Sequence, residues 1–297
     1  MKGKVHVVVS MDCERIRAES YRNDGTASWE MSELAITGLA ELLCQEGMKG
    51  TFLPTPATAA RQAHLFEELR RQQFEVGMQF HCDSFRDGEY EQILGAYGYD
   101  LQKEILTLAK ADWEEALGMP MLTYRSGYFS ANDFTFPILA ELGIKQTSCS
   151  KPGRYSPGMA LWYGALPYAH RPSAISRLQA GDLDVVEVPM TSHPGERFAM
   201  QPRFDPKDAR PDSGFKPEVY HDIVDAVLWE MEMIGPGVKT FVILTHNTLD
   251  YTSDREPRRG LLVDMLRYLK AKEEEGWQVV PATLADVRAA FLAQEGR

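Results

Sequence analysis

Five side chains that could hold a cation alternate along two short segments of the sequence. Asp12 and Glu14 lie in the first segment, and the second holds Gln79, His81 and Asp83. In a β-strand alternate side chains share a face, so each set would point to one side of its strand. If the strands are neighbours, three carboxylates, an imidazole and an amide converge, and carboxylates this close cannot all stay ionised without a cation. The pattern therefore predicts a metal site.

The segments that must position these residues alternate between strand and helix patterns. Apolar runs predict strands at 5–11, 50–53, 74–81, 121–125, 144–148, 184–188, 240–245 and 277–280. Amphipathic patterns predict helices at 29–46, 57–73, 89–117, 133–142, 217–234, 258–275 and 284–294. Strands that alternate with helices are typical of a parallel α/β fold, either a barrel or a doubly wound sheet.

The positions of the unusual polar residues favour the barrel. Asp12 follows the first predicted strand, His81 ends the third and Arg125 ends the fourth. His193 lies just past the sixth strand, and His246 follows the seventh. In a barrel, catalytic residues gather around an axis at the carboxyl ends of the strands, whereas a doubly wound sheet concentrates them in one crevice. We therefore expect all 297 residues to form a single distorted (β/α) barrel domain of about seven parallel strands.

The composition of the chain limits the classes of molecule that we expect it to bind. The formal charge of −11 argues against nucleic acid or an anionic membrane as a partner, because both select for basic surfaces. A small-molecule or glycan substrate fits better. The apolar run near the start is too short for a signal peptide, and no stretch of about 18 apolar residues follows, so the expected location is the cytoplasm. The oligomeric state stays open, with a homo-oligomer as one option.

The order of these elements, together with four short motifs, resembles the NodB-type polysaccharide deacetylases, carbohydrate esterase family 4. The resemblance runs from Val5 to about Ala289. It implies a distorted barrel of about seven strands. It also implies a hydrolase that removes the acetyl group from an N-acetylated sugar or polysaccharide precursor, with a divalent metal ion, expected to be zinc, as cofactor.

The first two motifs of the family concern the metal. The segment that ends in Asp12 and Glu14 looks like the family's D-x-D/E variant, which makes Asp12 the catalytic base and Glu14 a metal ligand. The second family motif has two histidines, but this chain has Gln79 and Asp83 at those positions, with His81 between them. The resemblance then implies Glu14, His81 and Asp83 as the ligands, and Gln79 as a weak or water-mediated contact near the substrate.

The third motif is the segment that contains Arg125, Tyr128 and Phe129. It looks like the family's R-x-x-(Y/W/F) motif, whose arginine pairs with the base. An arginine beside Asp12 would keep the pKa of that carboxylate low and fix its orientation. The resemblance implies that Tyr128 and Phe129 line the substrate groove, where either ring could pack on a sugar face.

The fourth motif is an apolar strand that ends in His246, which resembles the family's general acid. Together with a base and a bound ion, such a histidine suffices for amide or ester hydrolysis, because it can protonate the leaving amine. Asn247 beside it, and His193 in a loop flanked by proline and glycine, are further expected substrate contacts.

Two alternatives stay open. One is an allantoinase-like cytoplasmic amidohydrolase, since that branch resembles the same barrel and can depart from the metal triad. The other is a catalytically silent barrel that acts as a binding protein, for which Gln79 is the main evidence. The segments 151–181 and 196–215, which would decide the substrate, carry no readable motif.

Overall fold

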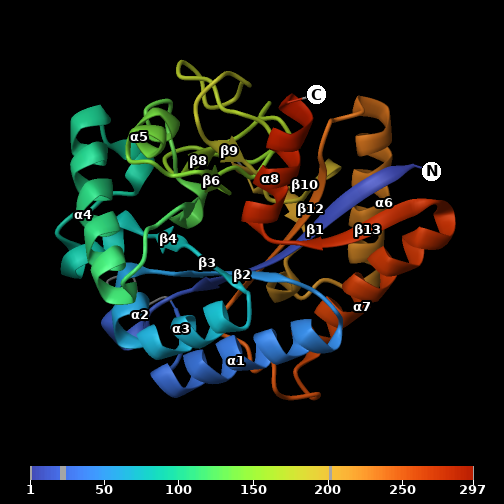
Figure 1. Ribbon diagram of the computed structural model, residues 1–297, viewed down its shortest axis with the longest axis horizontal. Helices are drawn as coiled ribbons and strands as arrows, with labels where there is room; N and C mark the ends of the chain where they lie inside the picture. The colour runs from blue at the N-terminus through green and yellow to red at the C-terminus, as the bar shows by residue number, and fades with distance from the viewer. Residues whose placement is uncertain (1, 21–24, 201–202, 297) are drawn as a thin grey trace.

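The computed structural model describes residues 2–20, 25–200 and 203–296, and its helices lie around the outside of a central layer of strands (Figure 1). The helices are α1 (Trp29–Gln45), α2 (Pro56–Arg61), α3 (Ala63–Arg71), α4 (Tyr99–Leu117), α5 (Thr135–Glu141), α6 (Pro217–Ile234), α7 (Pro257–Ala271) and α8 (Leu284–Glu295). Among the described helices, none combines the length and the apolar character that a membrane span requires.

The first parallel sheet is built around β1 (Gly3–Cys13). One edge of β1 pairs with β12 (Lys239–His246) along most of its length. The other edge pairs first with β13 (Trp277–Ala282) and then with β2 (Gly50–Pro54), and β3 (Glu75–Val76) lies beyond β2. The side chains of β1 are nearly all buried from its fifth residue onward, as expected for a strand that is covered on both faces.

The second parallel sheet has the order β4 (Met78–Phe80), β5 (Thr123–Ser126), β6 (Gln146–Thr147) and β9 (Val186–Glu187). The predicted strand 74–81 is thus two strands, one in each sheet. Gly77 separates them, and a Cβ atom there would lie 2.6 Å from the side chain of Thr123. Only glycine lets the backbone pass this close to β5.

The two sheets also meet on their other side, where Thr191 follows β9. Its amide donates to the carbonyl of Val242 on β12 at 3.3 Å, and its hydroxyl accepts from the amide of Val242 at 2.7 Å. The strand pairings of the described residues therefore give two parallel sheets joined at both sides, and not one continuous ladder of seven strands. The predicted parallel α/β fold is confirmed, and the closed seven-strand barrel is not confirmed by this strand order.

Two further predictions differ from the structure. The predicted helix 57–73 is interrupted at Gln62, whose φ of −121° lies outside the helical region. The side chain of Gln62 is buried and bonds to the Ser32 hydroxyl at 2.7 Å and to the Trp29 carbonyl at 3.1 Å, so α1 holds the break in place. The long helix predicted at 89–117 begins only at Tyr99.

Strands also occur in both segments that carry no readable motif, 151–181 and 196–215. β10 (Ser192–Met200) and β11 (Arg203–Asp208) form an antiparallel hairpin, and β11 pairs with β7 (Tyr155–Ser156). β8 (Ala160–Leu161) completes this four-stranded sheet. The sheet joins segments that are far apart in sequence, since Phe204 pairs with Tyr155, and local patterns carry no pairing signal over such a distance.

Candidate active site

Asp12 and Arg125 form a buried ion pair. The Arg125 Nη1 donates to Asp12 Oδ1 at 2.8 Å and to the Ser10 hydroxyl at 2.9 Å. The rest of the guanidinium donates to the carbonyl and hydroxyl of Ser148, at 3.3 and 3.0 Å, and Arg125 is fully buried. Burial raises the pKa of Asp12 above its ordinary value, although the charge of Arg125 opposes the rise. Arg125 therefore orients a carboxylate that is a stronger base than a free aspartate.

His246 lies directly beside Asp12, because the two residues pair across β1 and β12. Its Nδ1 is 2.6 Å from Asp212 Oδ2, and the other oxygen of Asp212 accepts from the Thr245 hydroxyl at 2.5 Å. Burial alone would lower the pKa of His246, but the hydrogen bond and the charge of Asp212 outweigh it and raise the pKa. The ring is therefore held in one orientation and stays protonated to a higher pH than a free histidine.

Sequence reasoning did not find Asp212. It lies in the segment 196–215, which shows no motif, and follows a proline in a single helical turn. No local pattern marks its link to a histidine 34 residues away. Only the packing of this turn against the end of β12 brings the two together.

Glu14 and His81 make direct contact, and Gln79 lies against both. The distance from His81 Nε2 to Glu14 Oε1 is 2.9 Å, and Gln79 Nε2 is 2.8 Å from the same oxygen and 2.6 Å from the same nitrogen. Burial raises the pKa of Glu14, but the charge of His81 and these hydrogen bonds outweigh it and lower the pKa to about 2. Glu14 is therefore ionised at neutral pH.

These residues do not fit the predicted three-ligand metal site. Donor atoms on one tetrahedral zinc ion lie about 3.4 Å apart, given bonds of about 2.1 Å, whereas two of the predicted ligand atoms, Glu14 Oε1 and His81 Nε2, are only 2.9 Å apart. Gln79 also directs its amide nitrogen, which is a hydrogen-bond donor and no ligand, at both partners. Asp83 is fully buried near the start of the short 3-10 segment Cys82–Gly88, whose backbone leaves the helical region at Phe85, Arg86 and Asp87. Among the described residues, no group of three His, Cys, Asp or Glu side chains is arranged to hold an ion.

The predicted base Asp12 and the predicted general acid His246 line one cavity of about 250 Å³, which we call the Asp12 pocket. Its lining includes Asp12, Glu14, Gln79, His81, Tyr128 and His246. Arg125 lies beneath Asp12 and has no place in this lining. The structure thus brings the predicted base and the predicted general acid to one cavity, with the contact between Glu14 and His81 in its wall.

Tyr128 and Phe129, two of the predicted substrate contacts, also line this pocket. The Tyr128 ring meets the His81 ring edge to face, with centroids 4.3 Å apart. Both residues have a φ of +56°, a backbone conformation that side chains other than glycine rarely adopt. A Cβ atom on Gly127 would lie 2.5 Å from His81 Nδ1. This strained turn is therefore shaped to hold an aromatic ring against His81.

Two other predicted substrate contacts lie elsewhere. Asn247 is fully buried, and its amide accepts from the Glu14 backbone N–H at 2.8 Å and donates to the Glu14 carbonyl at 2.8 Å. It positions the backbone of Glu14 and does not line the pocket. His193 lies outside the pocket as well, with its Nε2 3.2 Å from Asp222 Oδ2 on α6.

Two arginines that sequence reasoning missed line the Asp12 pocket. Arg154 donates to the carbonyl of Tyr128 at 3.0 Å, and Arg210 makes paired hydrogen bonds to Asp208 at 2.9 and 3.0 Å. Both come from the segments that carry no readable motif. Both arginines lie close to the antiparallel sheet of β7, β8, β10 and β11. The sequence does not reveal this shared position, because it depends on the pairing of these strands.

Comparison with solved structures identifies the fold. A protein from Mycobacterium smegmatis predicted to be a polysaccharide deacetylase is 18% identical, with 98% of this chain and 92% of that chain covered and a TM-score of 0.62. A predicted glycoside hydrolase or deacetylase from Parabacteroides distasonis is 10% identical, with 98% and 72% covered and a TM-score of 0.68. An allantoinase is 13% identical, with 100% and 92% covered and a TM-score of 0.59.

Neither protein-family models nor curated proteins gave a match to the sequence. At these identities the likeness to solved structures concerns the arrangement of the chain. It covers nearly the whole length of the chain, as the motifs predicted. The chain therefore has the fold of the NodB-type polysaccharide deacetylases.

Proposed function

We propose that this protein hydrolyses the amide bond of an N-acetyl group on a sugar or polysaccharide precursor. One observation carries the proposal: Asp12 and His246 line one cavity, and a separate ionic partner holds each of them. A reaction that needs both a base and an acid fits this arrangement. The resemblance of the motifs and of the fold to deacetylases supports the choice of an N-acetyl substrate.

Asp12 acts as the base. It takes a proton from a water molecule as the water oxygen adds to the carbonyl carbon of the acetyl group. The pair with Arg125 holds the carboxylate in place, and its raised pKa makes it a better proton acceptor. The guanidinium groups of Arg154 and Arg210 in the same pocket favour the negative charge that develops on the carbonyl oxygen.

His246 acts as the general acid. When the C–N bond breaks, the nitrogen must take up a proton, because an amine does not leave as an anion. Asp212 binds the Nδ1 of His246 and raises its pKa, which leaves Nε2 to donate that proton. The products are a free amine and acetic acid, which ionises to acetate. Asp12 releases its proton and His246 takes one up, by way of solvent, so both residues return to their starting states.

The proposed reaction uses no metal ion, because the residues near Glu14 do not form a three-ligand set. The resemblance predicts a zinc ion, whereas the arrangement around Glu14 leads us to expect that zinc binds weakly, and metal analysis of the purified protein decides between the two. We also propose that the two parallel sheets form the wall of one distorted barrel domain, as in the proteins of similar fold. The cytoplasmic location and the absence of nucleic-acid and membrane partners stay predictions from composition.

Acetate release tests the proposed function. The purified protein is incubated with oligomers of N-acetylglucosamine, and acetate is measured in an enzyme-coupled assay. We expect turnover by the natural protein and none by Asp12→Asn. Equal acetate release by both proteins would remove Asp12 as the base, and no release by either would favour the silent barrel.

A second candidate is hydrolysis of a C–N bond in a small cyclic or ureido amide, as in an allantoinase. The departure of Gln79 from the two-histidine pattern favours it, because the resemblance implies that this branch does without the full metal triad. Allantoin in the same experiment separates the two candidates, since its ring opening releases no acetate. Consumption of allantoin without deacetylation of the sugar would select this second candidate.

A further inference from the structure

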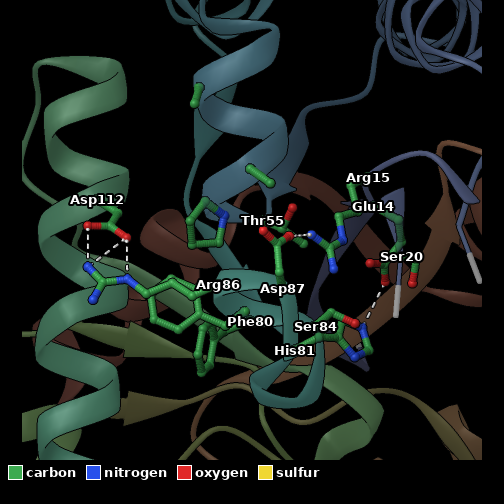
Figure 2. A pocket seen from close by; sticks show the side chains of 14 residues that line it. Glu14, Arg15, Ser20, Thr55, Phe80, His81, Ser84, Arg86, Asp87 and Asp112 are labelled. Atoms are coloured by element: carbon green, nitrogen blue, oxygen red, sulfur yellow. Dashed lines mark hydrogen bonds and ion pairs between the residues drawn. The ribbon is translucent and has the colours of Figure 1, made fainter. Parts of the chain in front are cut away.

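A second cavity of about 280 Å³ shares Glu14 and His81 with the Asp12 pocket, so the two cavities meet at this pair. We call it the Arg15 pocket. Its lining includes Arg15, Phe80, Ser84, Phe85, Arg86 and Asp87 (Figure 2). None of these residues takes part in the proposed chemistry, yet a substrate bound at Asp12 could extend past the pair into this cavity.

Arg15 is buried in this pocket, and its side chain has no close partner among the residues that the structure describes. The residue is only 8% exposed, and its nearest ion pair joins Nη1 to Asp87 Oδ1 at 3.8 Å. Its Nε is buried, and within the part of the chain that the structure describes it has no hydrogen-bond partner. Buried charged groups in proteins are normally paired and hydrogen-bonded. Since no described residue completes the hydrogen bonding of this guanidinium, its state points to a ligand as the partner.

The other arginine of the pocket provides the contrast. Arg86 makes hydrogen bonds of 3.1 to 3.3 Å with the two carboxylate oxygens of Asp112, and Figure 2 shows this pair apart from Arg15. Arg86 is therefore neutralised within the protein. Within the described ranges, the carboxylate that pairs with Arg15 is that of Asp87, whose side chain is 99% exposed and therefore keeps most of its contact with water.

The backbone holds Asp87 in this position at a cost. Arg86 and Asp87 have φ values of +47° and +57°, so two consecutive residues other than glycine adopt the left-handed conformation before Gly88 at +81°. Such strain is typical of turns that present a group at a binding site. The carboxylate of Asp87 thus occupies the place that another carboxylate could take from it.

The chemistry of the pocket selects a carboxylate over a phosphate. The planar fork of a guanidinium matches both oxygens of a carboxylate. Asp112 is paired with Arg86, but Glu14 and Asp87 add negative charge to the lining, which disfavours a phosphate dianion more than a monoanion. Phe80 and Phe85 are buried with their rings 5.2 Å apart and supply an apolar wall for the face of a sugar ring.

On the basis of the proposed function, we infer that the substrate is an N-acetylated sugar that carries a carboxylate, of the uronic acid type. The carboxylate binds Arg15 and displaces Asp87, while the acetamido group lies in the Asp12 pocket. Arg15 is then a residue that determines specificity and takes no part in the chemical step.

Calorimetric titration with matched probes tests this inference. N-acetylglucosaminuronate and N-acetylglucosamine differ only in a carboxylate against a hydroxymethyl group, and N-acetylglucosamine 6-phosphate tests for a phosphate site. We expect the uronate to bind most tightly. The variant Arg15→Gln should weaken uronate binding by about tenfold to a hundredfold, as loss of a hydrogen-bonded charge pair does, and should leave the neutral sugar unchanged. Arg17→Gln, an exposed position outside the pocket, is the control.

A second variant keeps the inference testable in case Arg15→Gln does not fold. Asp87→Asn changes an exposed side chain and removes the competing carboxylate, so it should strengthen uronate binding severalfold. Equal binding of the uronate and the neutral sugar, absence of binding of both, or tighter binding of the phosphate overturns the inference. Uronate binding that depends on Arg15 without acetate release would instead overturn the proposed function and leave the carboxylate site in place.

Discussion

Two buried arginines, Arg125 and Arg15, differ in how completely the protein pairs and hydrogen-bonds their charged groups. The guanidinium of Arg125 donates hydrogen bonds to Asp12, Ser10 and Ser148, all within 3.3 Å. In the part of the chain that the structure describes, Arg15 has one ion pair, at 3.8 Å, with an exposed carboxylate. A cation with complete internal bonding serves to position a neighbouring group, whereas a buried cation with incomplete bonding serves a ligand. The comparison separates the chemistry at Asp12 from the recognition at Arg15.

The largest effect is expected at Asp12. The variant Asp12→Asn should lower kcat for acetate release by about a thousandfold, because general base catalysis typically contributes factors of this order. Its binding of N-acetylglucosaminuronate, measured by calorimetry, should change little, since Arg15 is intact. A loss of uronate binding as large as the loss of kcat would mean that the two pockets do not act separately.

The second effect concerns stability. Removing one partner of a buried ion pair typically costs about 3–5 kcal/mol, so Arg125→Met should lower the free energy of unfolding by about that amount, as Asp12 loses its partner. Arg15→Met should leave the free energy of unfolding unchanged or raise it, because no close partner is lost. Urea unfolding of both variants measures the difference. A similar loss in both would erase the contrast between the two arginines.

The third effect appears in the pH dependence of kcat. The pKa of His246 is raised above its ordinary value of 6.5, so activity that needs the protonated ring persists above pH 6.5 and falls as the pH rises through the raised pKa. In Asp212→Asn the burial of His246 lowers its pKa, and the alkaline limb should move to lower pH. A shift of one pH unit lowers kcat on that limb about tenfold.

A matched control exists for the variant at Asp212. His221 pairs with Asp264 at 2.7 Å, but both side chains are partly exposed, and neither lines the Asp12 pocket. Asp264→Asn should leave the pH profile unchanged. If both variants shift the profile equally, the limb reports the net charge of the protein and not the protonation of His246.

The smallest effect is expected for metal uptake. After desalting, we expect the natural protein to retain much less than one zinc ion per chain, because Gln79 offers a donor where a ligand is needed. Gln79→His supplies the residue type that the family motif has at this position and should increase the retained zinc. Elemental analysis by mass spectrometry checks both proteins. One tightly held ion in the natural protein would show that Gln79 and Glu14 rearrange around a metal.

Much of the fold could be predicted from the sequence, because the apolar runs and the amphipathic patterns are local. β1 and β12 lie where the pattern placed them, and their register brings Asp12 beside His246. The pairing of Arg125 with Asp12 followed from a motif with a fixed partner, and the structure has it at 2.8 Å. Site residues that lie in a regular strand or in a recognisable motif could therefore be identified from the sequence.

The rest depends on contacts between distant segments. Asp212 and Arg210 belong to the chain beside β11, and no periodic pattern connects that chain to His246. Arg15 follows the predicted ligands directly, but its incomplete bonding becomes visible only when the distance to Asp87 is known. Asp83 shares the spacing of a ligand, yet the strand ends at Phe80 and a helical turn begins, so the alternation stops before it.

The amide of Asn247 joins the backbone of Glu14 to the end of β12, across 233 residues of sequence. β1 also needs β12 and β13 to cover its edges, and both belong to the last fifth of the chain. During synthesis the first strand must therefore wait, with its apolar side chains uncovered, until these strands leave the ribosome. We expect contacts of such long range to make folding slow and to leave incomplete chains inactive and prone to aggregation.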